Sequence, residues 1–86
     1  MDFLFLEGLA QALEAKGDLD NARKAYEEAA AAAPGEMRTQ ARMGEARILV
    51  TQGRNEEAAA VYRKILAENP DSPQKEFIQI ELSHLS

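Results

Sequence analysis

The chain has 86 residues, which is enough for one small domain. It contains no cysteine, which excludes disulfides and cysteine-ligated zinc, and its one histidine, His84, cannot form a histidine cluster for a metal. Its formal net charge of −5 is opposite to the basic excess with which nucleic-acid-binding proteins neutralise phosphates. We therefore expect no nucleic-acid partner, no metal and no cofactor.

The sequence offers no membrane-spanning segment. The longest apolar run is the five alanines from Ala29 to Ala33, far short of the ~18 residues that a span requires. The apolar N-terminal residues 3–6 lack a basic region before them and end at Glu7, which argues against an intact signal peptide. We expect a soluble protein of the cytoplasm or the periplasm, without direct membrane insertion.

The charges are distributed unevenly along the chain. Residues 1–37 have three bases and eight acids, residues 38–64 have six bases and three acids, and residues 65–86 have one base and four acids. A basic centre between acidic ends would attract an acidic partner or one end of a second copy. A solvated helical surface with local salt bridges explains the same pattern without a partner.

Abundant alanine, few β-branched residues and regularly placed glycine and proline predict an all-α fold. The expected helices cover about residues 2–16, from 18 or 20 to 33, 36–52, 55–68, and 73 onward. Gly17 and Gly53 are the expected stops of the first and third helices, because glycine adopts the left-handed conformation without a Cβ clash. Pro34-Gly35 and Asn69-Pro70 end the second and fourth helices.

Polar residues next to these breaks are candidate helix caps. Asp18 or Asp20 would cap the second helix, and Asn55 would cap the fourth. Pro73 fits the first turn of the fifth helix, where its missing N–H is not needed.

The same breaks reveal an internal repeat. Six identities recur at an offset of 36 residues: Gly8 and Gly44, Leu13 and Leu49, Gly17 and Gly53, Ala22 and Ala58, Tyr26 and Tyr62, Pro34 and Pro70. So many matches at one offset indicate tandem helical hairpins.

The residues of the first copy resemble a tetratricopeptide repeat (TPR). The resemblance rests on Leu6, Leu9, Ala10, Leu13, Gly17, Asp18, Ala22, Tyr26, Ala29 and Pro34. The second copy has Ala46, Leu49, Gly53, Ala58, Tyr62, Ile65 and Pro70, but it has Arg42 and Glu45 where the family usually has large apolar residues. Met43 and Ile48 are the residues that would compensate for this departure. The plain, alanine-rich repeats look bacterial.

The resemblance implies one domain over residues 1–86. Repeat one would cover residues 3–36 and repeat two residues 39–72, followed by a capping helix or the start of a third repeat over residues 73–86. It also implies a right-handed α-solenoid whose concave face is lined by the first helix of each repeat.

No combination of residues predicts catalysis. The acidic pairs Glu27-Glu28 and Glu56-Glu57 are adjacent on helices, so the two side chains of each pair point about 100° apart and do not converge. A serine–histidine pairing could use only His84 with Ser83 or Ser86 at the C-terminus, where a solvated histidine is expected, and the glycines do not form a phosphate-binding loop. We expect a protein that is not an enzyme.

The concave groove implied by the resemblance is the first candidate site. Its partner-binding side chains would be Glu7, Gln11, Gln40, Met43, Arg47 and Gln79. Some TPR proteins hold a terminal carboxylate with lysine and asparagine at the positions of Glu7 and Gln11, so that clamp is absent here and only Arg47 could bind an acidic ligand. Gly8 and Gly44 would leave room for a ligand backbone. Ordinary surface positions remain the alternative interpretation.

The apolar ends of the chain are the second candidate site. Solenoid ends normally have a polar outer face, but the first helix begins with apolar residues on all sides, and the last has apolar residues outside its main stripe. The candidates for self-association are Phe3, Phe5, Phe77 and Ile80. A fragment of a longer protein, a second copy, and a docking partner protein would each explain such ends. Folding of Phe3 and Phe5 onto the second helix is a further alternative.

These observations favour a non-catalytic protein–protein interaction module that binds a protein or peptide partner. A self-assembly (oligomerisation) module of a larger parent protein is the alternative, and a homodimer is one such assembly. A small-molecule binder would need convergent inward polar groups, whereas the periodic positions hold alanine, leucine and tyrosine.

Overall fold

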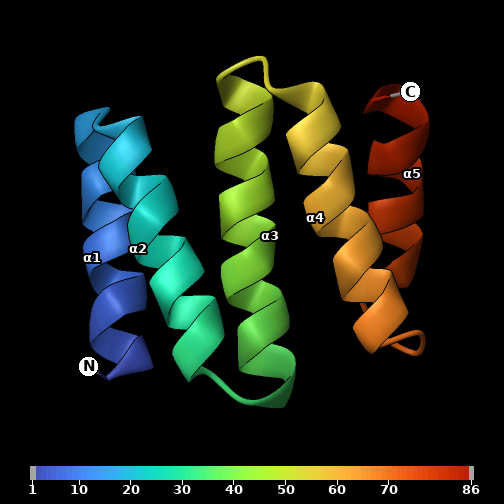
Figure 1. Ribbon diagram of the computed structural model, residues 1–86, viewed down its shortest axis with the longest axis horizontal. Helices are drawn as coiled ribbons and strands as arrows, with labels where there is room; N and C mark the ends of the chain where they lie inside the picture. Colours follow the sequence, from blue (N-terminus) through green and yellow to red (C-terminus); the bar gives the residue numbers. More distant parts are fainter. Residues whose placement is uncertain (1, 86) are drawn as a thin grey trace.

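The computed structural model describes residues 2–85, which form five helices and no strand. The helices are α1 (Phe3–Lys16), α2 (Leu19–Ala32), α3 (Gly35–Thr51), α4 (Asn55–Glu68) and α5 (Lys75–Leu85). They lie side by side in chain order, so that α1 and α5 form the two ends of the row (Figure 1). Each helix packs against the next one, and this arrangement confirms the expected all-α tandem of hairpins.

The two hairpin turns are closed in the same way 36 residues apart. Gly17 has φ +91° and Gly53 has φ +77°, the left-handed conformation that the sequence predicted for both glycines. The Asp18 N–H donates to the Leu13 carbonyl at 2.9 Å, and the Arg54 N–H donates to the Leu49 carbonyl at 2.8 Å. Both turns therefore satisfy the last carbonyls of the preceding helix with backbone groups.

The expected caps were partly wrong. Asp18 occupies the N-cap of α2, but its carboxylate accepts from the Asn21 side-chain amide at 2.9 Å and not from the helix backbone. Asn55 is the first residue of α4, and Arg54 occupies the cap. Only Asp2 makes a side-chain cap among the described N-caps, accepting from the Leu4 N–H at 2.9 Å.

The fifth helix also begins later than expected. Pro73 lies in a turn, and α5 starts at Lys75. Ser72 is buried, its hydroxyl accepts from the Gln74 N–H at 3.2 Å, and its carbonyl accepts from the Lys75 N–H at 3.0 Å. These bonds hold a separate turn before the helix.

Alanines and two tyrosines dominate the core. Ala10, Ala22, Ala46 and Ala58 have no exposed surface, which allows the helix backbones to approach closely. Tyr26 forms one cluster with Ala10, Ala22, Ala25 and Ile48. Ile48 of α3 is one of the residues expected to compensate for Arg42 and Glu45.

Tyr26 joins the first hairpin to the second. A Cβ atom added at Gly44 of α3 would lie 2.5 Å from Cε1 and 2.6 Å from Cζ of the Tyr26 ring. The expectation that Gly44 leaves room for a ligand backbone is therefore wrong, because the tyrosine already fills that space. Gly8, the equivalent residue of α1, has nothing within 4 Å of such a Cβ.

The C-terminal helix covers the far side of the second hairpin. Ile78 is fully buried in a cluster with Tyr62, Ile65 and Ala46, and Leu82 and Leu85 pack against that cluster. Phe77 and Ile80 lie outside this stripe and are 46% and 55% exposed. Within residues 2–85, no helix combines the length and the hydropathy that crossing a bilayer requires.

Candidate interaction surfaces

A polar junction connects the first helices of the two hairpins. Arg47 of α3 donates from Nε to Glu14 Oε2 at 2.9 Å and from a terminal nitrogen to Glu14 Oε1 at 2.7 Å, a bidentate pair with α1. The Tyr26 hydroxyl donates to Glu14 Oε1 and accepts from Arg47, both at 3.2 Å. Three helices therefore meet at one set of hydrogen bonds.

The junction shifts the ionisation of its members. The hydrogen bond from Arg47 lowers the pKa of Glu14, and the same bond raises the pKa of Arg47. Burial and then the charge of Glu14 raise the pKa of Tyr26. The three groups are held as a carboxylate, a guanidinium and a neutral phenol at neutral pH.

Arg47, the one groove residue expected to bind an acidic ligand, is therefore already paired. Its side chain is half exposed, but its guanidinium is paired with Glu14 and lies 5.9 Å from the centre of the Tyr26 ring. An acidic ligand would have to compete with Glu14. This pair could not be predicted from local spacing, because Glu14 and Arg47 are 33 residues apart.

The other groove candidates remain mostly open to solvent. Gln11 on α1, Gln40 on α3 and Gln79 on α5 are exposed, and Glu7 is half-buried. Met43 is half-buried and packs against the cluster around Tyr62, so most of its role is in the core. The structure joins none of these five residues to one another by a described hydrogen bond.

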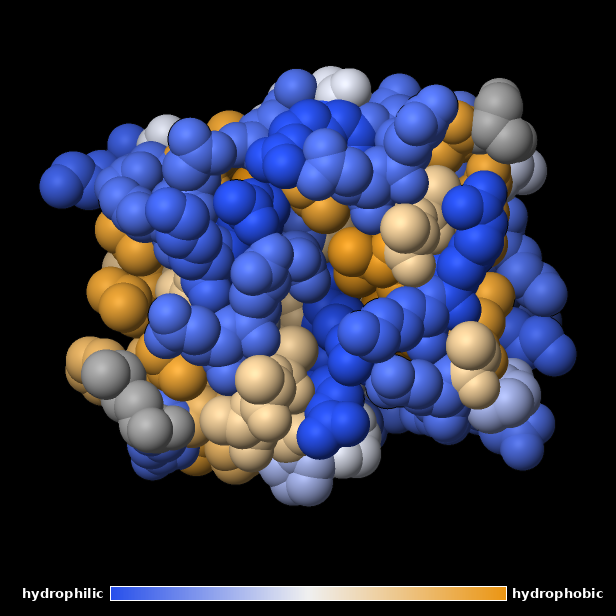
Figure 2. Space-filling model, in the orientation of Figure 1, coloured by the Kyte–Doolittle hydropathy of each residue, from blue (hydrophilic) through white to orange (hydrophobic). Residues whose placement is uncertain are grey.

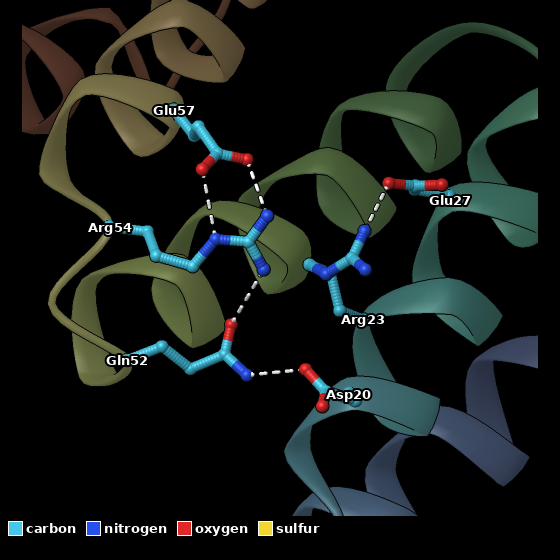
Figure 3. Close-up of polar contacts among 6 residues, drawn as sticks. All are labelled: Asp20, Arg23, Glu27, Gln52, Arg54 and Glu57. Carbon is cyan, nitrogen blue, oxygen red and sulfur yellow. Dashed lines mark hydrogen bonds and ion pairs between the residues drawn. The ribbon is translucent and has the colours of Figure 1, made fainter.

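A second polar network lies where α2 meets the turn after α3. The Gln52 amide donates to Asp20 at 2.9 Å, and Arg54 reaches Gln52 and both carboxylate oxygens of Glu57 (Figure 3). Arg23 pairs with Glu27 beside it at 2.6 Å. The bond between Gln52 and Asp20 joins the two hairpins at the surface. None of these residues was a candidate partner-binding residue in the sequence.

The joint between α2 and the second hairpin contains charged residues. Glu45 of α3 is half-buried, and burial followed by the neighbouring Glu27 carboxylate raises the pKa of Glu45 to about 7. Arg42 donates to Glu68 of α4. Arg42 is therefore accommodated by an acidic partner, and Glu45 by a raised pKa that favours its neutral form.

A hollow of about 540 Å³ lies between the start of α3 and the end of α4. Its two arginines are already bonded. Arg38 donates from Nε to the Ala30 and Ala33 carbonyls at the end of α2, and Arg42 donates to Glu68. This hollow therefore offers no unpaired arginine to an anion. Among residues 2–85, no group of three or more acidic or histidine side chains is arranged to hold a metal.

Large apolar side chains are exposed mainly on the two end helices. Those at least 40% exposed are Leu4, Phe5 and Leu9 on α1, Met37 on α3, and Phe77 and Ile80 on α5. Phe3, one of the candidates for self-association, is half-buried and is less exposed than Phe5. Figure 2 shows hydrophobic surface along the edge of the molecule that α1 forms in Figure 1. A hollow of about 350 Å³ beside it is lined by Leu6, Leu9, Leu13, Asn21, Lys24, Ala25 and Glu28.

Comparison with protein families supports this architecture. The family model described as tetratricopeptide repeat matches residues 7–73, most of the chain. The chain belongs to the tetratricopeptide repeat family. The match includes both hairpins and stops just before α5. Comparisons with curated proteins and with solved structures found no match. TPR repeats generally mediate protein–protein interactions, and the family is typically non-catalytic.

Proposed function

We propose that this chain is a non-catalytic protein-interaction module that binds a partner protein or peptide through its first helices and its apolar ends. The observation that carries the proposal is the placement of exposed apolar side chains. Five of the six large ones lie on α1 and α5, the helices with a neighbour on one side only. Apolar surface of this kind marks an interface when it is contiguous.

The exposed surface of α1 and α3 has groups that fit a peptide partner. Gln11 and Gln40 are exposed on the first helices of the two hairpins, which the Glu14–Arg47 pair fixes relative to each other. A glutamine amide both donates and accepts, so it suits the alternating N–H and C=O groups of an extended peptide. A rigid scaffold lowers the entropy lost when such a peptide binds.

Selection from a random peptide library displayed on phage tests this function. The immobilised chain should enrich peptides whose affinity falls at least tenfold in the double variant Gln11→Ala/Gln40→Ala or in Phe77→Gln. Glu56→Ala, at an exposed position of α4, is the matched control and should leave the affinity unchanged. Failure to enrich any peptide, or equal binding by all the variants, would contradict the proposal.

A further inference from the structure

One face of α1 is exposed and apolar over residues 4–12. Leu4, Phe5, Gly8, Leu9 and Ala12 are all exposed. Their spacing of one, four, five and eight residues places them on a single side of the helix. Leu4, Phe5 and Leu9 are 56%, 59% and 40% exposed, which is costly for a surface helix that stays in water. We refer to these five residues as the α1 face.

The corresponding face of α3 shows what this surface is built to contact. Offset by 36 residues, Phe5, Gly8 and Ala12 correspond to Ala41, Gly44 and Ile48. All three are buried, with α2 packed over them and the Tyr26 ring against Gly44. In α3 this side of the helix is a helix–helix contact, whereas in α1 the same side is open.

We propose that the α1 face binds a second copy of the chain, with the two α1 helices antiparallel across a two-fold axis near Gly8. This inference rests on the proposed function and names the partner of one of its surfaces. Size complementarity is the first argument for a second copy. The large residues Leu4 and Phe5 precede Gly8, whereas the less exposed Leu9 and the small Ala12 follow it. An antiparallel two-fold pairing therefore places Leu4 and Phe5 of each helix against the Gly8–Ala12 segment of the other.

Glycine at the crossing point allows the two backbones to approach closely. No atom lies within 4 Å of the Cβ position at Gly8, so the space beside this glycine is empty within one chain. The Phe5 side chain of each copy would lie over the Gly8–Ala12 segment of the other. A mutual contact of this kind is self-complementary and closes as a dimer.

Charge complementarity is the second argument. Asp2 stands at the N-terminus of α1 and Lys16 in its last turn, so antiparallel pairing brings Asp2 of each copy towards Lys16 of the other. The two helix dipoles also oppose each other in this arrangement. Glu7 and Glu14 lie away from the face by helical spacing, and Glu14 is paired with Arg47, so like charges do not meet at the contact.

The mass in solution tests the proposal. Sedimentation or light scattering from about 1 to 500 µM should show the chain passing from monomer to dimer. One helix pair buries less surface than a standard interface, so we expect a dissociation constant on the order of 10–100 µM. Phe5→Gln should raise that constant at least tenfold, as should Ala12→Lys, which places a long charged side chain where Leu4 of the other copy should pack. Phe77→Gln on α5 is the matched control, because Phe77 is also exposed, and it should leave the constant unchanged.

A cysteine cross-link tests the orientation. The chain has no cysteine, so Gly8→Cys introduces a single thiol. A disulfide requires Cα atoms within about 7 Å, a distance that only a crossing near this residue provides. Gly8→Cys should oxidise to a covalent dimer at concentrations where the unmodified chain dimerises. Ile80→Cys, exposed on α5, should stay uncross-linked under the same conditions.

A monomer at every concentration would overturn the proposal, and so would a dimer that Phe77→Gln disrupts while Phe5→Gln and Ala12→Lys do not. Circular dichroism shows whether each variant is folded, and the two α1 variants affect only exposed positions. Binding of a foreign helix to the α1 face of a strictly monomeric chain would also refute it. In that case the peptides selected through Gln11, Gln40 and Phe77 would still bind, so the interaction function would survive the loss of the dimer.

Discussion

Gly8 and Gly44 occupy equivalent positions of the two repeats, and changing each to alanine should have opposite effects on stability. Both glycines lie within helices and neither has a positive φ, so the backbone accepts alanine at both sites. Alanine is favoured over glycine inside a helix by about 1 kcal/mol. At Gly8 nothing lies within 4 Å of the new methyl group, so Gly8→Ala should raise the free energy of unfolding by about 1 kcal/mol.

At Gly44 the same gain meets a collision. The new methyl carbon would lie 2.5, 2.6 and 2.8 Å from three carbons of the Tyr26 ring. The ring cannot move away easily, because Tyr26 is 2% exposed and its hydroxyl is bonded to Glu14 and Arg47. Overpacking of this kind costs about 1–3 kcal/mol. A cost near the upper end leaves a net loss of about 1–2 kcal/mol for Gly44→Ala.

Urea unfolding followed by circular dichroism measures both changes. The protein concentration should be about 1 µM, because at this value the proposed dimer is dissociated and Gly8→Ala reports on the monomer. A stabilising effect at both sites would mean that Tyr26 does not pack against Gly44. A loss at both sites would mean that another element covers Gly8.

Three further predictions concern the core and the charged groups. Ala58→Leu should lower the free energy of unfolding by about 1–3 kcal/mol, because Ala58 has no exposed surface; a neutral result in urea unfolding would show that the hairpin register is wrong. Arg47→Ala should cost about 0.5–1 kcal/mol at low salt and less at 1 M NaCl, because the pair with Glu14 is partly exposed; equal losses at both salt concentrations would contradict an electrostatic role. The pKa of Glu45 is raised in the folded state from 4.5 to about 7, so its stabilising contribution is complete below pH 4.5 and is lost as the pH rises through 7. Glu45→Gln should remove this loss and increase stability by on the order of 2 kcal/mol at pH 8 relative to pH 5; equal effects at both pH values, in thermal unfolding, would refute the assignment.

The fold was predictable because its determinants are local and repeated. Glycine at the helix ends and proline after them act through the backbone of a few neighbouring residues, so most helix boundaries agree with the expectation within two residues. The caps at Asp18 and Asn55 were less predictable, since a side chain that can cap a helix can also bond to another side chain.

The contacts between the repeats could not be derived in the same way. Glu14, Tyr26 and Arg47 come from three helices, and their bonds depend on how two hairpins pack. A signal was present, since a tyrosine and a glycine recur at the same offset in both copies. Only the structure shows that the Tyr26 ring packs against Gly44 of the next hairpin, whereas nothing packs against the Cβ position of Gly8 in its own hairpin.

The distribution of polar residues between the two repeats bears on the proposed dimer. In an isolated solenoid, the internal joint should be apolar and the outer end should be polar. Here the joint contains the half-buried Glu45, whose pKa is raised by burial, whereas the equivalent residue of the outer helix is Leu9, 40% exposed. This reversal is costly on both sides as long as the chain is alone in water. A second α1 helix over the α1 face would bury Leu9 and Phe5 and remove the cost on the outer side.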